Sequence, residues 1–172
     1  GPRGCPVSLL YLEIDDFNLI NDSMGHEVGD EVLKLVAARL RANVEAPDCV
    51  GRVAGSEFLA VLRPGAEAVE AQAARLLQSL ALPVEPLGTL HYLRINAGLA
   101  HCPEHGRTPE RLFRNAGLAT HEARRRGQHQ LVAYTPEFDR AAGDRLQLVS
   151  RLHEAIEKNE FASAGAASGR LG

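Results

Sequence analysis

The chain of 172 residues has few cysteines, little excess charge and no long hydrophobic run. Its three cysteines, Cys5, Cys49 and Cys102, are odd in number and far apart, which argues against a disulfide framework and for a reducing compartment. A formal net charge of −3 gives no sign of nucleic-acid binding. No apolar run approaches the ~18 residues of a membrane span, and no signal peptide is evident. We therefore expect a cytoplasmic fragment without membrane contact of its own, which leaves open a parent protein attached to a membrane elsewhere.

The length and a hydrophobic content of 45% predict one domain with a substantial core. Both ends differ from the rest of the chain. Within segment 1–7, Gly1 and Pro2 resemble the remnant of a cleaved tag, and the small residues of 162–172 have no apolar pattern to bury. We expect the tail to be disordered or artificial in origin.

Apolar periodicity predicts alternating strands and helices. Strands are predicted over residues 8–15, 50–53, 58–62, 83–87, 90–100 and 130–134. Helices are predicted over 16–24, 30–41, 66–80, 109–126 and 144–159, with a break at 25–27. Thr108 is the expected N-cap of the helix that Pro109 opens and Gly127 ends. Hairpins mixed with helical crossovers indicate an α/β (α+β) fold, a mixed central sheet flanked by helices.

Two charged clusters are candidates for chemistry. Glu13, Asp15 and Asp16 crowd a strand end, where they would suit Mg²⁺ if the 50–62 hairpin lies alongside. On spacing alone, the more common explanation is a solvated strand end, with Asp16 favouring a helix start. The run 124–126 of three arginines either complements the helix dipole or binds phosphate.

Two loop segments are less specific. Ala54-Gly55-Ser56-Glu57 is either a solvated hairpin tip or part of a site. His101, Cys102 and His105 have loosely metal-like spacing but no second ligand pair, so we expect ordinary loop residues.

Three stretches of the chain follow the motif pattern of a known domain family. The first, YLEIDDFNLINDSMGHEVGDEVL, has IND, GH and GD at the family spacing and resembles LDxDxFKxINDxxGHxxGDxxL, the opening pattern of the GGDEF domain family. RVAGSEFLAVL resembles the segment that names the family, and INAGLAHCPEHGRTPERLFRNAGLATHEARRRGQHQLVAY resembles its closing stretch. The resemblance runs from Ser8 to Tyr134 and implies a nucleotidyl-cyclase-like domain over 8–135.

Family members are bacterial diguanylate cyclases: two domains, each holding GTP and Mg²⁺, face each other and join the nucleotides into cyclic di-GMP. The resemblance implies that Asn21 and Asp30 read the guanine edge, for which an amide and a carboxylate are suited. It also implies that Gly55 lets the backbone approach the phosphates and that Arg124 keeps the charge of a phosphate-binding lysine.

Other implied site positions are changed. Glu13 stands for an aspartate and remains a weakened metal ligand, together with the Ile14 backbone. Ser56 stands for an acidic metal ligand and lacks its charge, so Mg²⁺ binding is possible but weakened. Ala54 replaces the first glycine, and Glu57 keeps a family position that is expected to be structural. We therefore expect no catalysis at Ser56 and Glu57.

The product-inhibition motif R-x-x-D is also degenerate. Asp48 remains, but Glu45 stands in place of arginine and would repel the phosphates of the product. We expect no product binding there.

The segment RLQLVSRLHEAIEKNEFA resembles the helix that opens an EAL domain, the cyclic di-GMP phosphodiesterase module. We therefore interpret 136–161 as a linker and the start of an adjacent EAL domain. Three functions stay open: an inactive regulatory domain with GTP as a possible ligand, a weak diguanylate cyclase, or a nucleotide-free scaffold, with homodimerisation possible.

Overall fold

The computed structural model describes residues 6–45, 49–127 and 129–168. Its internal contacts divide the chain into two units, residues 1–135 and 136–172. Within the described ranges, no helix is long and apolar enough to span a membrane.

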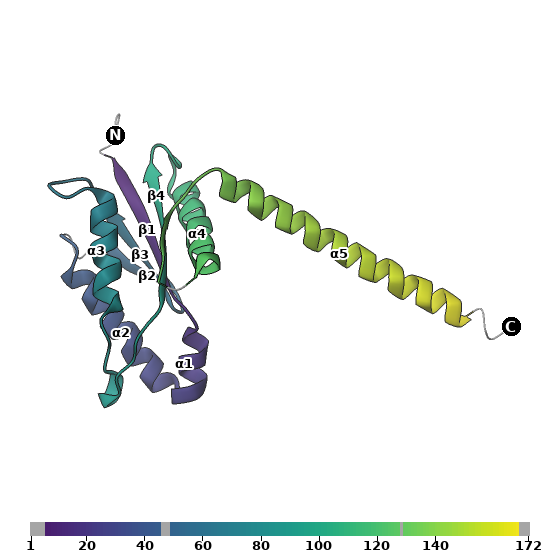
Figure 1. Cartoon of the computed structure of the whole chain (residues 1–172), viewed down its shortest axis with the longest axis horizontal. Coiled ribbons are helices and arrows are strands. Elements are labelled where there is room, and N and C mark those ends of the chain that lie inside the picture. The colour runs from purple at the N-terminus through teal and green to yellow at the C-terminus, as the bar shows by residue number, and fades with distance from the viewer. Residues whose placement is uncertain (1–5, 46–48, 128, 169–172) are drawn as a thin grey trace. The chain divides into compact units, whose positions relative to one another are not determined.

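The first unit is built on a mixed sheet of five strands in the order β2-β3-β1-β4-β5 (Figure 1). The strands are β1 (Val7–Ile14), β2 (Val50–Ala54), β3 (Glu57–Leu62), β4 (Ile95–Cys102) and β5 (Leu131–Ala133). β1 pairs antiparallel with both β3 and β4, and β5 is parallel to β4. The predicted fold class, a mixed sheet flanked by helices, is confirmed.

Helices cover both faces of this sheet (Figure 1). α2 (His26–Ala42) and α3 (Val69–Ala81) pack on one face, α4 (Pro109–Arg126) covers the other, and α1 (Phe17–Met24) packs on α2. Alternate residues of β1 and β3 point into the core beneath α2 and α3: Leu10, Leu12, Ile14, Phe58, Ala60 and Leu62. The residues between them, including Tyr11, Glu13 and Glu57, therefore lie on the α4 face.

α4 lies in direct backbone contact with β4. A Cβ atom on Gly98 would lie 2.2 Å from the carbonyl oxygen of Ala116 and 2.4 Å from the backbone nitrogen of Thr120. Only glycine permits this approach. As predicted, Thr108 caps the helix, since its hydroxyl accepts from the N–H of Arg111 at 3.2 Å.

Three local predictions differ from the structure. The predicted strand 83–87 is a bridge between Val84 and His91 followed by the short 3₁₀ helix η2 (Pro86–Gly88), because proline fixes φ and donates no hydrogen bond. The strand predicted over 90–100 is β4, which begins at Ile95. The break predicted over 25–27 is confined to Gly25, whose φ of +91° ends α1 and allows α2 to begin at His26.

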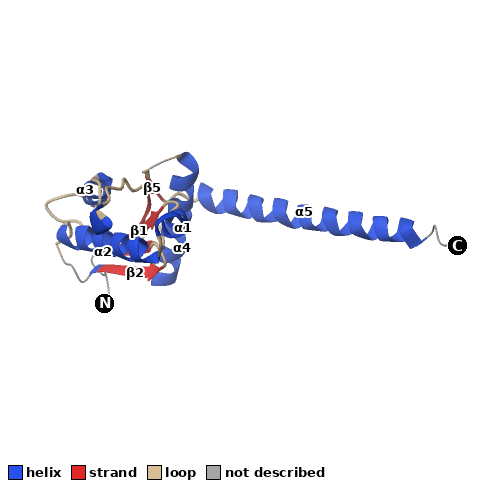
Figure 2. Cartoon of the chain, turned by 90° about the horizontal axis from the view of Figure 1, so that it is seen from below, coloured by secondary structure: helices blue, strands red, loops and turns tan. Residues whose placement is uncertain are grey.

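The second unit is the helix α5 (Glu137–Ser168), which Figure 2 shows as one continuous ribbon. It begins before the predicted helix 144–159 and continues into the segment expected to be a disordered tail. Exposed apolar side chains gather between residues 146 and 156: Leu146, Leu148, Val149, Leu152 and Ile156.

The contact at Gly98 generates a prediction. Gly98→Ala is expected to destabilise the domain by about 1–3 kcal/mol or more, because the added methyl meets backbone atoms that cannot rotate away. Urea unfolding followed by circular dichroism measures the loss. Gly51→Ala in β2, with no atom within 4 Å of its added Cβ, is the control and should change stability little. Equal effects of the two substitutions would contradict this account of α4 packing.

Candidate functional site

The end of β1 is joined to the β2–β3 turn by a backbone hydrogen bond. The N–H of Ile14 donates to the carbonyl oxygen of Ser56 at 3.0 Å. Gly55 adopts a φ of +44°, which favours glycine, and the β2–β3 register shifts between Arg52 and Ala54 just before the turn. The Nε–H of Arg52 donates to the carbonyl oxygen of Gly55 at 2.9 Å. The turn thus presents the half-buried Ser56 beside the end of β1.

Two carboxylates face each other beside this turn. Glu13 of β1 is directly opposite Glu57 of β3 in the register, and both lie on the α4 face of the sheet. Like charges at such positions destabilise a sheet. Arg124, in the last turn of α4, forms an ion pair with Glu13 through its Nη2. Residues 111 positions apart are thereby brought together.

Tyr11 completes this cluster. Burial raises the pKa of its hydroxyl, a hydrogen bond to Glu57 and the charges of Glu57 and Glu13 raise it further, and Arg124 opposes them. The hydroxyl therefore stays protonated near neutral pH and acts as a donor. Sequence reasoning missed Tyr11, although it lies two residues before Glu13 and so on the same face of β1.

Asn96 is a second missed residue. It pairs with Glu13 across β1 and β4, is fully buried, and within the described ranges neither polar atom of its amide has a hydrogen-bond partner. A buried amide without partners is costly, so this polar side chain enclosed beside Glu13 is a feature of the site. Only the strand register reveals it.

The predicted guanine-reading residues lie at the junction of α1 and α2. A Cβ atom on Gly29 would lie 1.8 Å from Oδ1 of Asn21, so a glycine at this position leaves room for the Asn21 side chain. The next residue, Asp30, is exposed and lines a groove of about 410 Å³ between α2 and β2, together with Lys34 and Arg52. A carboxylate beside cations suits a ligand that carries both hydrogen-bond donors and phosphates.

The three arginines of 124–126 form ion pairs with two different carboxylates. Arg124 is paired with Glu13, whereas Arg125 and Arg126 are both paired with the buried Glu122 of the same helix, at 2.6 and 3.1 Å. The hydrogen bond from Arg125, then that from Arg126, lowers the pKa of Glu122 to about 2 against the opposing effect of burial. Arg125 and Arg126 thus form ion pairs within α4, whereas Arg124 pairs with the end of β1.

No metal cluster forms in the described residues: no three histidine, cysteine or acidic side chains are arranged to hold an ion. His101 lies at the end of β4, where its Nδ1 is 2.6 Å from the Ser8 hydroxyl and its Nε2 is 3.3 Å from Glu70. The backbone N–H of His101 donates to Nδ1 of His105 at 3.0 Å. These contacts tie the end of β4 to β1 and α3.

The degenerate inhibitory motif is only partly described. Glu45 is exposed, and Asp48 falls in 46–48, outside the described residues. The expectation of no product binding at this motif stays a prediction.

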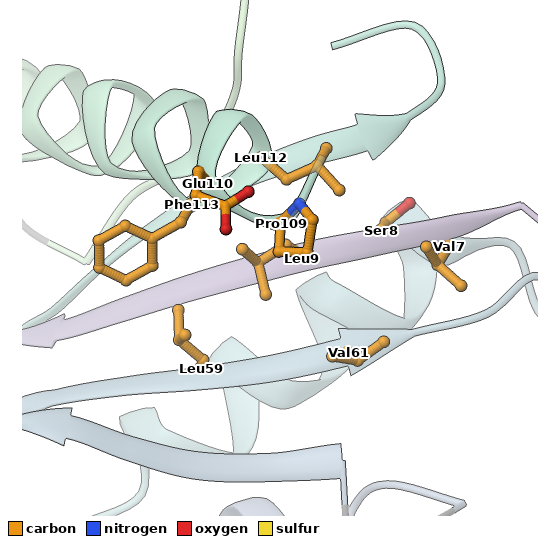
Figure 3. Close-up of a pocket in the computed structure, with 9 residues that line it drawn as sticks. All are labelled: Val7, Ser8, Leu9, Leu59, Val61, Pro109, Glu110, Leu112 and Phe113. Atoms are coloured by element: carbon orange, nitrogen blue, oxygen red, sulfur yellow. The ribbon is translucent and has the colours of Figure 1, made fainter. Parts of the chain in front are cut away.

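A cavity of about 590 Å³ lies elsewhere, between the start of α4 and strands β1 and β3 (Figure 3). Its lining is apolar apart from Ser8 and Glu110, and it contains none of the predicted site residues. The lining residues are Val7, Ser8, Leu9, Leu59, Val61, Pro109, Glu110, Leu112 and Phe113.

Comparisons with known proteins agree with the resemblance. Residues 2–130 match the family described as "Diguanylate cyclase, GGDEF domain". The chain is 32% identical to the cyclic di-GMP phosphodiesterase NbdA of Pseudomonas aeruginosa, over 92% of this chain and 20% of that protein. It is also 32% identical to MucR of the same organism, a bifunctional diguanylate cyclase/cyclic di-GMP phosphodiesterase, over 90% of this chain and 23% of that protein. A crystal structure of an EAL/GGDEF domain protein from M. capsulatus superposes with a TM-score of 0.72 at 35% identity, covering 78% of this chain and 88% of that one. The chain spans about a fifth to a quarter of the length of these curated relatives.

The lowered pKa of Glu122 generates a prediction about pH. Since folding depresses this pKa, the paired carboxylate stabilises the fold above its ordinary pKa of 4.5, and that contribution is lost as the pH falls toward about 2. Glu122→Gln is therefore expected to be less stable than the parent chain at pH 7, with the difference shrinking between about pH 4.5 and pH 2. Urea unfolding across this range measures it, and a difference that does not vary with pH would refute the assignment.

Proposed function

Because the chain belongs to the GGDEF family of diguanylate cyclase domains, we propose that it is a catalytically inactive member that binds GTP and regulates an adjacent EAL phosphodiesterase domain. Its role in cyclic di-GMP signalling follows from the family and the relatives. The proposal concerns what this copy of the domain does within that role.

The contrast between the two halves of the site carries the proposal. On the guanine side, the Asn21 side chain lies against Gly29, and Asp30 lines the groove between α2 and β2. These side chains supply the amide and carboxylate that guanine recognition needs. On the phosphate side, Ser56 stands where the family has an acidic metal ligand.

The residues of the phosphate side do not fit the divalent cations that the family resemblance implies. Such ions prefer carboxylate oxygens, and the Ser56 hydroxyl brings no charge. The remaining acid, Glu13, is ion-paired with Arg124. Without charge neutralisation on the phosphates, the attack of a 3′-hydroxyl on a second nucleotide is not stabilised. Binding without turnover is the expected result.

The regulatory role is supported by the relatives and by the end of the chain. NbdA is named a phosphodiesterase and MucR a bifunctional enzyme, and this chain matches only a part of each. Residues 145–162 resemble the opening helix of an EAL domain, and α5 carries exposed apolar side chains along this segment. We propose that a following EAL domain covers them, as the partner that GTP binding controls, with homodimerisation as a further interaction.

Calorimetric titration of GTP into the purified chain tests binding and turnover together. We expect micromolar affinity and no cyclic di-GMP in the same mixtures by chromatography. Asp30→Ala is expected to weaken binding at least about tenfold, since it removes charge-assisted hydrogen bonds to guanine. Product formation would show that the chain is a weak cyclase, and no heat at millimolar GTP would favour a nucleotide-free scaffold.

Gly29→Ala tests whether Asn21 reads the nucleotide. The added methyl displaces the Asn21 amide and crowds Cζ of Phe17, which would lie 3.2 Å away, so GTP affinity is expected to fall several-fold. Because alanine favours a helix by about 1 kcal/mol over glycine, stability should change little. Gly117→Ala in α4 is the control, since its Cβ would make only an ordinary contact at 3.9 Å with Tyr11. Unchanged GTP affinity in Gly29→Ala would argue against a role for Asn21.

A further inference from the structure

The two carboxylates at the end of β1, Glu13 and Glu57, need a positive charge beside them. Glu13 and Glu57 face each other in the register, and the side chain of Glu13 is only 18% exposed. Partly buried carboxylates at this spacing repel unless a positive charge lies between or beside them. In the part of the chain that the structure describes, Arg124 forms an ion pair with Glu13 that meets this need, and its side chain is 44% exposed.

The position of Arg124 is fixed by the fold. α4 packs directly on β4 at Gly98, which fixes the position of the helix on the sheet. Arg125 and Arg126 are both paired with Glu122 of the same helix, so Arg124 is the arginine of this run that reaches the β1 end. A guanidinium carries five N–H donors, so contact with Glu13 through Nη2 leaves donors for another anion.

Resting on the proposed GTP binding, we infer that Arg124 takes the place of the metal ions in this chain. Its guanidinium neutralises the carboxylates at the β1 end when no nucleotide is bound. GTP then binds without Mg²⁺, and its phosphates draw Arg124 away from Glu13. Glu13 thus acts as a competitor of the phosphates for this arginine, rather than as a metal ligand.

The first test compares GTP affinity of the unaltered chain in EDTA and in Mg²⁺. GTP is expected to bind at least as tightly in EDTA, because Mg²⁺ masks the phosphate charge that Arg124 recognises. Binding that strengthens about tenfold or more with Mg²⁺ would overturn the inference while leaving the proposed function intact. No binding of GTP or guanosine in either condition would overturn both.

The second test changes the pair itself, with all titrations in EDTA. Glu13→Gln is expected to tighten GTP binding by about tenfold, since it removes the competing charge, and to leave guanosine binding unchanged. Arg124→Gln should lower GTP affinity to that of guanosine, and Arg124→Lys should restore part of it. Arg125→Gln is the matched control, because this neighbouring arginine pairs with Glu122, and it should bind GTP as the parent chain does. Weaker GTP binding in Glu13→Gln, with thermal unfolding unchanged, would contradict the competition.

Discussion

The position of β1 between β3 and β4 determines what the rest of the site can do. Because β1 is antiparallel to both neighbours in a fixed register, Glu13 meets Glu57 on one side and Asn96 on the other. A slip of one residue would move these polar groups into the core and expose Leu12. The burial of alternate leucines on β1 therefore also sets the electrostatics of the site.

The proposed replacement of the metal ions by Arg124 would separate this chain from a metal-dependent enzyme. A metal ion is exchangeable and can bring charge together with the substrate, whereas an arginine side chain is a permanent part of the fold. A site neutralised by its own arginine is closer to charge balance before any nucleotide arrives. Such a site is suited to recognising an anion and poorly suited to building up the positive field that phosphoryl transfer requires.

The sequence predicted the elements that depend on local patterns and failed where distant residues meet. Alternation in 8–15 and helical spacing in 109–126 gave β1 and α4, and Thr108 marked its cap, since each signal lies within a few residues. The segment 83–87 is predicted as a strand, but the proline at position 86 imposes a turn. The motifs placed Glu13, Ser56 and Arg124 in one site, but the ion pair and the buried amide of Asn96 depend on tertiary contacts that no local pattern contains.

The close backbone contact between α4 and Gly98 of β4 also limits how the helix can move. With backbone atoms of the helix so close to Gly98, α4 cannot slide along the sheet without a clash between main chains. In the proposed competition, Arg124 exchanges partners through rotations of its own side chain, which occur in picoseconds to nanoseconds at exposed positions, rather than through slower helix displacements. The proposed regulation of an adjacent domain would then rest on a redistribution of surface charge at the end of α4, and not on a mechanical displacement of the helix.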